Sequence, residues 1–125
     1  MKNRKTLIVL ALMAAALLVA VAGQAEENET TPDYSKMKGK ELYKSLCKPC
    51  HMEDSEAGEY TPMSLIMEQW DEFYDGVFQE THKDVACPKD ETKLVPAAFD
   101  KDMIKKLRKF CVDHAADSEQ PMTCG

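Results

Sequence analysis

The sequence lacks the features that mark several large classes of protein. It has no excess of positive charge, since 16 Lys and Arg stand against 22 Asp and Glu, for a net charge of −6. Nucleic-acid binding is rewarded by clustered positive charge, so that class is disfavoured. The chain also shows no nucleotide-binding loop, no internal repeat and no alternating strand pattern of useful length. Its 125 residues fit a single, mostly helical domain.

The N-terminal segment is typical of an export signal. A positively charged start precedes an apolar run of Leu, Ala and Val, and small residues, Gly23 and Ala25, precede a polar stretch. We therefore expect residues 1–25 to be a signal peptide, residues 26–35 a flexible leader, and residues 36–125 an exported, for example periplasmic, domain with no stable membrane span. The apolar run also approaches the minimum of about 17 residues for a spanning helix, so an uncleaved anchor is the alternative.

Signal removal makes the domain more acidic. It takes away Lys2, Arg4 and Lys5 and no acidic residue, so 13 basic residues then stand against 22 acidic ones, a net charge of −9. Such a surface favours partner proteins with a basic docking surface.

The export prediction also bears on the cysteines, which number five: Cys47, Cys50, Cys87, Cys111 and Cys124. An oxidising compartment favours disulfides, yet five is an odd number. If Cys47 and Cys50 bind a cofactor, a Cys111–Cys124 disulfide would tie the C-terminal tail to the last helix and leave Cys87 as a free thiol. A Cys87–Cys111 pairing is the alternative.

The segment "CKPCH", Cys47 to His51, carries the chemistry. Two thiols at this spacing reach the two vinyl groups on one edge of a porphyrin, and the next residue places its imidazole under the iron. The motif therefore predicts one covalent c-type haem, held by Cys47 and Cys50, with His51 as proximal ligand. A structural zinc site and a redox dithiol are alternatives, but no second C-x-x-C, no H-x-x-x-H and no preceding strand is present.

Hydrophobic periodicity predicts about three helices, at residues 35–47, 61–76 and 100–115. Ser35 is the expected cap of the first, and Thr61 followed by Pro62 starts the second, which Gly76 ends. Asp100 is the expected cap of the last. The intervening residues 78–98 show no sustained period and are expected to be a long loop.

These segments resemble class I c-type cytochromes over residues 36–115. "GKELYKSLCKPCH" is similar to the opening of that family, with matches at Gly39, Tyr43, Cys47, Cys50 and His51. "MSLIMEQWDEFYDG" and "FDKDMIKKLRKFCVDH" resemble the middle and C-terminal helices. The resemblance implies a small monohaem fold, helices and long loops wrapped around one haem, in which the last helix packs across the first.

The resemblance breaks at the distal ligand, because Val95 in "KLVPAAF" stands where the family has Met. His82, between the middle and last helices, is the preferred distal iron ligand. The rivals are an open site or a side chain among His114, Met103, Met63, Met67 and Met122. A filled distal position predicts an electron carrier that is not an enzyme, whereas an open one predicts a haem enzyme or sensor.

Overall fold

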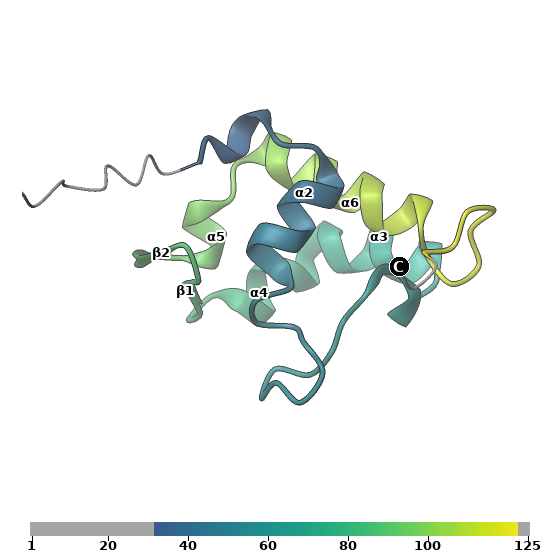
Figure 1. The fold of residues 1–125 in the computed structure, drawn as a ribbon, viewed down its shortest axis with the longest axis horizontal. Coiled ribbons are helices and arrows are strands. Elements are labelled where there is room, and N and C mark those ends of the chain that lie inside the picture. Colours follow the sequence, from purple (N-terminus) through teal and green to yellow (C-terminus); the bar gives the residue numbers. More distant parts are fainter. Residues whose placement is uncertain (1–31, 123–125) are drawn as a thin grey trace, which may run out of the picture. The chain divides into compact units, whose positions relative to one another are not determined.

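The computed structural model describes residues 32–122, so the expected signal peptide and most of the expected leader lie outside the described residues. The helical elements, in chain order, are η1 (Tyr34–Lys36), α2 (Gly39–Leu42), η2 (Tyr43–Cys47), η3 (Pro62–Ser64), α3 (Met67–Glu72), η4 (Phe73–Val77), α4 (Phe78–His82), α5 (Val95–Ala98) and α6 (Lys101–Asp113). One small antiparallel sheet joins β1 (Ala86–Cys87) to β2 (Asp90–Leu94). The expectation of a mostly α fold is confirmed (Figure 1).

The first helix consists of α2 and a wider π-helical turn, η2, which continues it without a break. Ser35 does not cap this helix, contrary to expectation, because it lies inside the separate 3₁₀ turn η1. Instead, Lys38 precedes the helix, and the Glu41 carboxylate accepts a hydrogen bond from the Lys38 N–H at 2.9 Å. A side chain at the third helical position thus satisfies a backbone donor that the helix leaves unpaired.

The middle helix begins and ends later than the sequence pattern predicts. Pro62 starts only the 3₁₀ turn η3, and the longer helix begins at Met67. It then runs through the π-helical turn η4 into α4 and ends at His82. The prediction that Gly76 ends the helix is therefore wrong. Gly76 has no positive φ, and nothing lies within 4 Å of a Cβ built on it. Neither a left-handed backbone nor a close approach therefore requires glycine at this position.

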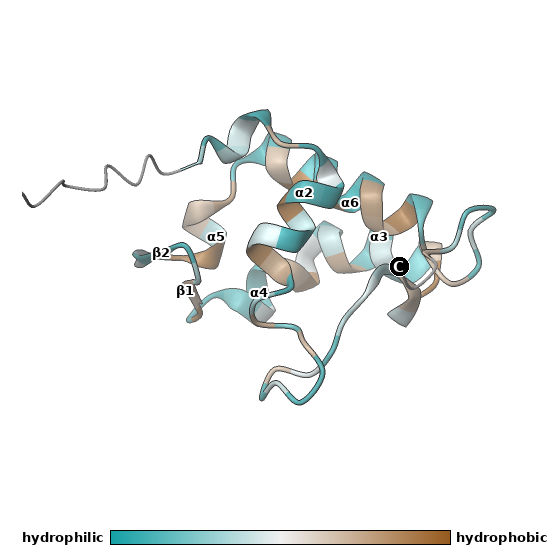
Figure 2. Cartoon of the chain, in the orientation of Figure 1, coloured by the Kyte–Doolittle hydropathy of each residue, from teal (hydrophilic) through white to brown (hydrophobic). Residues whose placement is uncertain are grey.

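The last helix, α6, agrees closely with the sequence. Asp100 caps it, since its carboxylate accepts from the Met103 N–H at 2.8 Å. Apolar residues at helical spacing are buried on one face, and α6 alternates hydrophobic and hydrophilic bands along its length (Figure 2). The buried residues of α6 are Met103, Leu107, Phe110 and Cys111.

Helices α2 and α6 cross in close contact, as the resemblance implied (Figure 1). Gly39 lies at the crossing: a Cβ built there would overlap the carbonyl oxygen of Lys106 and come within 2.7 Å of the Phe110 Cβ. Only a residue without a side chain allows the two backbones to approach this closely.

Residues 78–98 are not the long loop that was expected. They contain α4, the hairpin of β1 and β2, and the short helix α5. The hairpin pairs Ala86 with Leu94 and Cys87 with Asp90, and its register is irregular between these pairs. β1 has only two residues and no residue of β2 is buried, so neither strand carries an alternating apolar pattern in the sequence.

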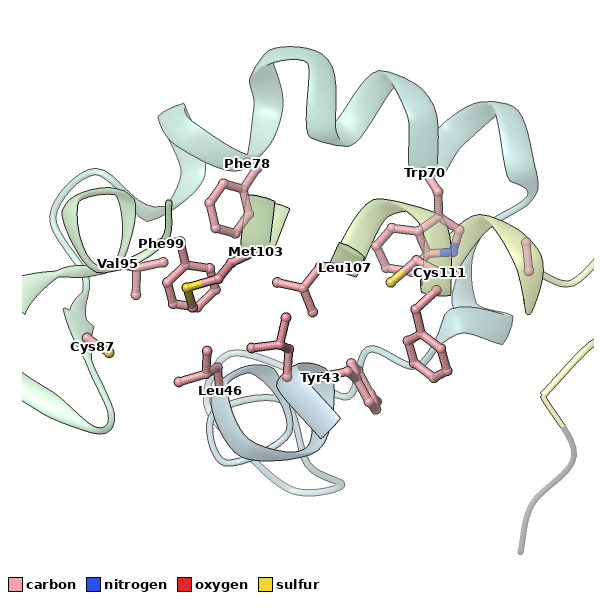
Figure 3. Packing of buried hydrophobic residues seen from close by; sticks show 13 residues of the cluster. Tyr43, Leu46, Trp70, Phe78, Cys87, Val95, Phe99, Met103, Leu107 and Cys111 are labelled. Carbon is pink, nitrogen blue, oxygen red and sulfur yellow. The ribbon is translucent and has the colours of Figure 1, made fainter. Parts of the chain in front are cut away.

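One core joins these elements. Leu42 and Leu46 of the first helix belong to it together with Leu107 of α6. Trp70 and Phe78 extend into it from the middle helix (Figure 3). The indole N–H of Trp70 donates to the Pro62 carbonyl at 2.8 Å. Over residues 32–122 no helix has the length and apolar character needed to cross a bilayer.

Candidate functional site

The CKPCH segment forms one tight turn at the end of η2. The N–H groups of Cys50 and His51 both donate to the Cys47 carbonyl, each at 3.1 Å. Cys47 and Cys50 are free, partly buried thiols in the described part of the chain. Two unpaired thiols and an imidazole on a single turn are what covalent attachment of a porphyrin edge requires.

The Cys47 thiol is a poor candidate for thiolate chemistry. Burial, helped by the nearby Cys111 and Cys50, raises the pKa of Cys47 to about 12. A reactive dithiol depends on a thiolate and therefore on a lowered thiol pKa. The environment of Cys47 thus does not favour the redox-dithiol alternative.

His51 is held by the loop that follows it. Its Nδ1 lies 3.1 Å from the carbonyl oxygen of Gly58, a residue with φ +79° at the point where the loop turns back. Because a carbonyl oxygen only accepts, Nδ1 carries the hydrogen and Nε2 keeps its lone pair. The Tyr60 ring packs edge-on against the imidazole at 5.4 Å, and the Tyr43 hydroxyl donates to the Tyr60 carbonyl at 2.9 Å. The loop therefore fixes both the tautomer and the position of His51.

His82 is held in the same way by its own helix. It is the last residue of α4, and its Nδ1 lies 2.9 Å from the Phe78 carbonyl, one turn earlier. In the neutral imidazole Nδ1 would again carry the hydrogen, which leaves Nε2 as the nitrogen that could bind a metal. A metal-bound histidine almost always donates its other ring N–H in this manner, which sets its orientation and raises its basicity.

The fold brings these two imidazoles together from distant parts of the chain. The ring centroids of His51 and His82 are 6.1 Å apart, and the ring planes meet at 80°. Two imidazoles on opposite sides of one metal ion, each with a metal–nitrogen bond of about 2 Å, have ring centres about 6 Å apart. The separation of the two rings is the one expected for two imidazoles that share a metal ion.

The two histidines are not part of a larger ligand cluster. Among residues 32–122 no group of three or more His, Cys, Asp or Glu side chains is placed to hold a metal ion. A structural zinc site requires four protein ligands, so the described residues lend no support to the zinc alternative. A haem iron needs only two, because the porphyrin nitrogens supply the other four.

The rival distal ligands lie elsewhere. Val95, at the position where the family has Met, is a core residue, and so is Met103. His114 lies at the end of α6, where its Nδ1 bonds the Gln120 carbonyl at 2.8 Å and its ring packs against Phe110. The remaining candidate methionines are Met63 and Met67, which are exposed, and Met122, which packs against the core.

Exposed apolar side chains flank the two histidines along the chain. Met52 and Tyr60 belong to the loop after His51, and Val77 and Val85 stand on either side of α4. Each is between 39% and 51% exposed.

Cys111 lies in the core, and its Sγ is 3.6 Å from the Tyr74 hydroxyl. The expected Cys111–Cys124 disulfide stays a prediction, because Cys124 lies outside the described residues. Cys87 and Cys111 are both free and buried within residues 32–122, so the alternative Cys87–Cys111 pairing is not formed there.

Sequence reasoning missed the groups that orient the two imidazoles. The Gly58 carbonyl depends on a loop conformation that carries no motif. Phe78 was within reach of the sequence, because it lies four residues before His82, but the helix had been predicted to end at Gly76.

Comparison of the chain with protein-family models, with curated proteins and with solved structures finds no match. Any assignment of function therefore rests on the geometry of the residues described above and on the resemblance of the motif.

Proposed function

We propose that this chain is an exported electron carrier with one covalent c-type haem. Cys47 and Cys50 would bind the porphyrin edge, His51 would be the proximal ligand and His82 the distal ligand. The observation that carries the proposal is the His51–His82 pair, with 6.1 Å between ring centroids and both Nδ1 atoms bonded to backbone carbonyls.

The carrier role follows from two filled axial positions. When bound, the haem supplies an iron that takes up and releases one electron. His51 and His82 keep other molecules from that iron, so no substrate bond is made or broken and the protein is not an enzyme in this role. Hydrogen bonds from Nδ1 to the Gly58 and Phe78 carbonyls raise the basicity of each Nε2 and so strengthen its bond to a metal. Ligation by two imidazoles also gives a lower potential than ligation by His and Met.

Charge supports a partner with a basic docking surface. Residues 51–91, which contain both histidines, carry twelve Asp and Glu but only two basic residues, Lys83 and Lys89. A surface of one sign attracts an oppositely charged partner over several ångströms and speeds association. The haem-binding part of the chain is therefore the part with the strongest negative charge.

The test begins with the full chain, including its signal, expressed in a host that attaches c-type haem. Mass spectrometry of the exported protein should show residues 1–25 removed and one porphyrin added, and alkaline pyridine should give a haem c spectrum. The bare polypeptide, produced while a known c-type cytochrome matures in the same host, would contradict the proposal.

The second step compares His82→Ala with the matched variant His114→Ala. Wild type and His114→Ala should be six-coordinate and low-spin and should not bind carbon monoxide. His82→Ala should become high-spin in the ferrous form and bind carbon monoxide readily. Unchanged low-spin bands in His82→Ala would remove His82 from the iron, and carbon monoxide binding by wild type would favour an enzyme or sensor instead.

A further inference from the structure

Phe78 contacts His82 in two independent ways. Its carbonyl oxygen is 2.9 Å from His82 Nδ1, and its ring lies 4.7 Å from the imidazole, centroid to centroid, at an interplanar angle of 34°. The hydrogen bond fixes which edge of the imidazole faces the helix. The ring contact restricts rotation about the remaining side-chain torsion.

Phe78 is itself rigidly held. Its side chain is only 4% exposed and points from α4 into the core (Figure 3). The ring stacks on Tyr74 at 5.8 Å and 28°, meets Phe99 at 5.6 Å and is approached edge-on by Phe73 at 5.9 Å. A ring packed on three sides in a dense core has one orientation, and it transmits that orientation to its neighbour.

His51 is oriented by different residues. The Gly58 carbonyl and the Tyr60 ring hold it, and neither belongs to the middle helix. The angle of 80° between the two imidazole planes is therefore the result of two separate supports, one in the loop and one in α4.

We propose that Phe78 is a positioning residue that holds the His82 ring perpendicular to the His51 ring across the haem. This inference rests on the proposed function, since it concerns the same two ligands. Phe78 would act through His82 and not on the iron itself. Without its ring the imidazole would keep the hydrogen bond to the carbonyl of residue 78 but lose the ring contact that limits its remaining rotation.

The angle has a spectroscopic consequence. Each imidazole π system raises the energy of one of two iron d orbitals. Parallel rings raise the same orbital and separate the pair, whereas perpendicular rings raise both and leave them nearly equal. A nearly degenerate pair retains orbital angular momentum, so a ferric low-spin haem with perpendicular ligands gives one strongly anisotropic electron paramagnetic resonance signal with a large maximum g value. Parallel ligands give an ordinary rhombic three-line spectrum.

The test records this spectrum for the ferric holoprotein and its variants. Wild type should give the single signal with a large maximum g value. Phe78→Leu should lose that signal and show a rhombic species, alone or mixed with others. Phe78→Met, which also removes the ring but has a flexible side chain that adapts to an irregular gap, is the second variant in case Phe78→Leu does not fold.

Phe110→Leu is the matched control. Phe110 is also a buried helical residue, at 8% exposure, and its ring contacts are with Tyr43 and His114. This variant should be destabilised to a similar degree and keep the wild-type spectrum. A general loosening of the core would instead change both.

Two results would overturn the inference while leaving the proposed function intact. One is a rhombic spectrum in a wild-type protein that loses its low-spin state in His82→Ala. The other is a wild-type spectrum in both Phe78 variants. Failure to attach haem, or ligation that survives His82→Ala, would contradict the proposed function itself.

Discussion

Gly39 of α2 lies against Phe110 of α6, and a Cβ added to Gly39 would come within 2.7 Å of the Phe110 Cβ. The Lys106 carbonyl oxygen is nearer still. The contact is backbone to backbone, so no rotation of a side chain relieves it. The packing of the last helix across the first therefore depends on the absence of a side chain at position 39.

Replacing Gly39 with Ala should destabilise the protein. Alanine favours a helix over glycine by about 0.5–1 kcal/mol, but overpacking at a close contact costs about 1–3 kcal/mol. We expect a net loss of about 1–2 kcal/mol, measured as a lower urea midpoint at unchanged slope. The control is Gly76→Ala. Nothing lies within 4 Å of the added Cβ there, so this variant should gain stability. Equal effects of the two substitutions would argue against the close crossing.

The Asp100 cap should contribute measurably to α6. Its carboxylate accepts the Met103 N–H at 2.8 Å, and loss of such a cap costs about 1 kcal/mol. Asp100→Ala should therefore unfold at a lower denaturant concentration than wild type. Asp102→Ala removes a carboxylate two residues away that only pairs with Lys106 on the surface, and it should cost no more than about 0.5 kcal/mol. A larger loss from Asp102→Ala would show that charge near the helix start, rather than the cap, is responsible.

The stability of the protein should fall in alkaline solution, because the Cys111 thiol and the Tyr74 hydroxyl are buried in the core. Burial raises the pKa of Cys111 to about 11 from an ordinary value of 9.0, against a smaller opposing effect of the Tyr74 hydrogen bond. Burial also raises the pKa of Tyr74 well above its usual range. Between about pH 9 and 11 the unfolded chain releases a proton that the folded Cys111 retains, so the free energy of unfolding decreases as pH rises. At about 1.4 kcal/mol per pKa unit, Cys111 accounts for about 2–3 kcal/mol of this loss.

Urea unfolding of wild type and Cys111→Ala at several alkaline pH values would measure the effect. A reducing agent is included in all samples, because a Cys111–Cys124 disulfide would remove the free thiol. The variant loses stability at every pH through lost packing, but its decline between about pH 9 and 11 should be shallower. Parallel curves for the two proteins would contradict a contribution from Cys111.

The acidic charge around His51 and His82 should make electron exchange sensitive to salt. The rate of reaction of the holoprotein with a small cationic redox complex should fall with ionic strength, and the rate with an anionic complex should rise. Neutralising Glu53, Glu56 and Glu59, all in the exposed loop after His51, should weaken both trends. The control neutralises Asp102, Asp113 and Glu119, which removes the same charge from another part of the chain. An equal change in both triple variants would mean that net charge alone sets the rate.

The parts of the fold that the sequence predicted correctly are those with local signals. Helix α6 was predictable because Asp100 is a cap and Met103, Leu107 and Phe110 recur at helical spacing. Gly39 was predictable as a crossing point because glycine on a helix face permits close approach. The turn from Cys47 to His51 carries its own motif.

Other features depend on contacts that a sequence does not display. The hydrogen bond from the Lys38 N–H to the Glu41 carboxylate explains why the first helix begins after Lys38 and why Ser35 is not its cap. From the sequence alone, Ser35 and Glu41 are both reasonable capping residues, and only the structure shows which one acts. Gly76 has the chemistry of a helix end, but the chain continues helically around it because Trp70 and Phe78 on either side are both anchored in the core. The approach of His82 to His51 follows from that continuation and from the return of the loop at Gly58.

The number of residues in the π-helical turn η4 determines which way the side chains of the following helix α4 point. A π turn carries one residue more than a regular helical turn, and one residue corresponds to about 100° of rotation about the helix axis. Deleting a single codon between positions 73 and 77 would leave a regular helix of good composition and yet turn Phe78 and His82 away from their present neighbours. Insertions and deletions in this short stretch are thus far more restricted than substitutions.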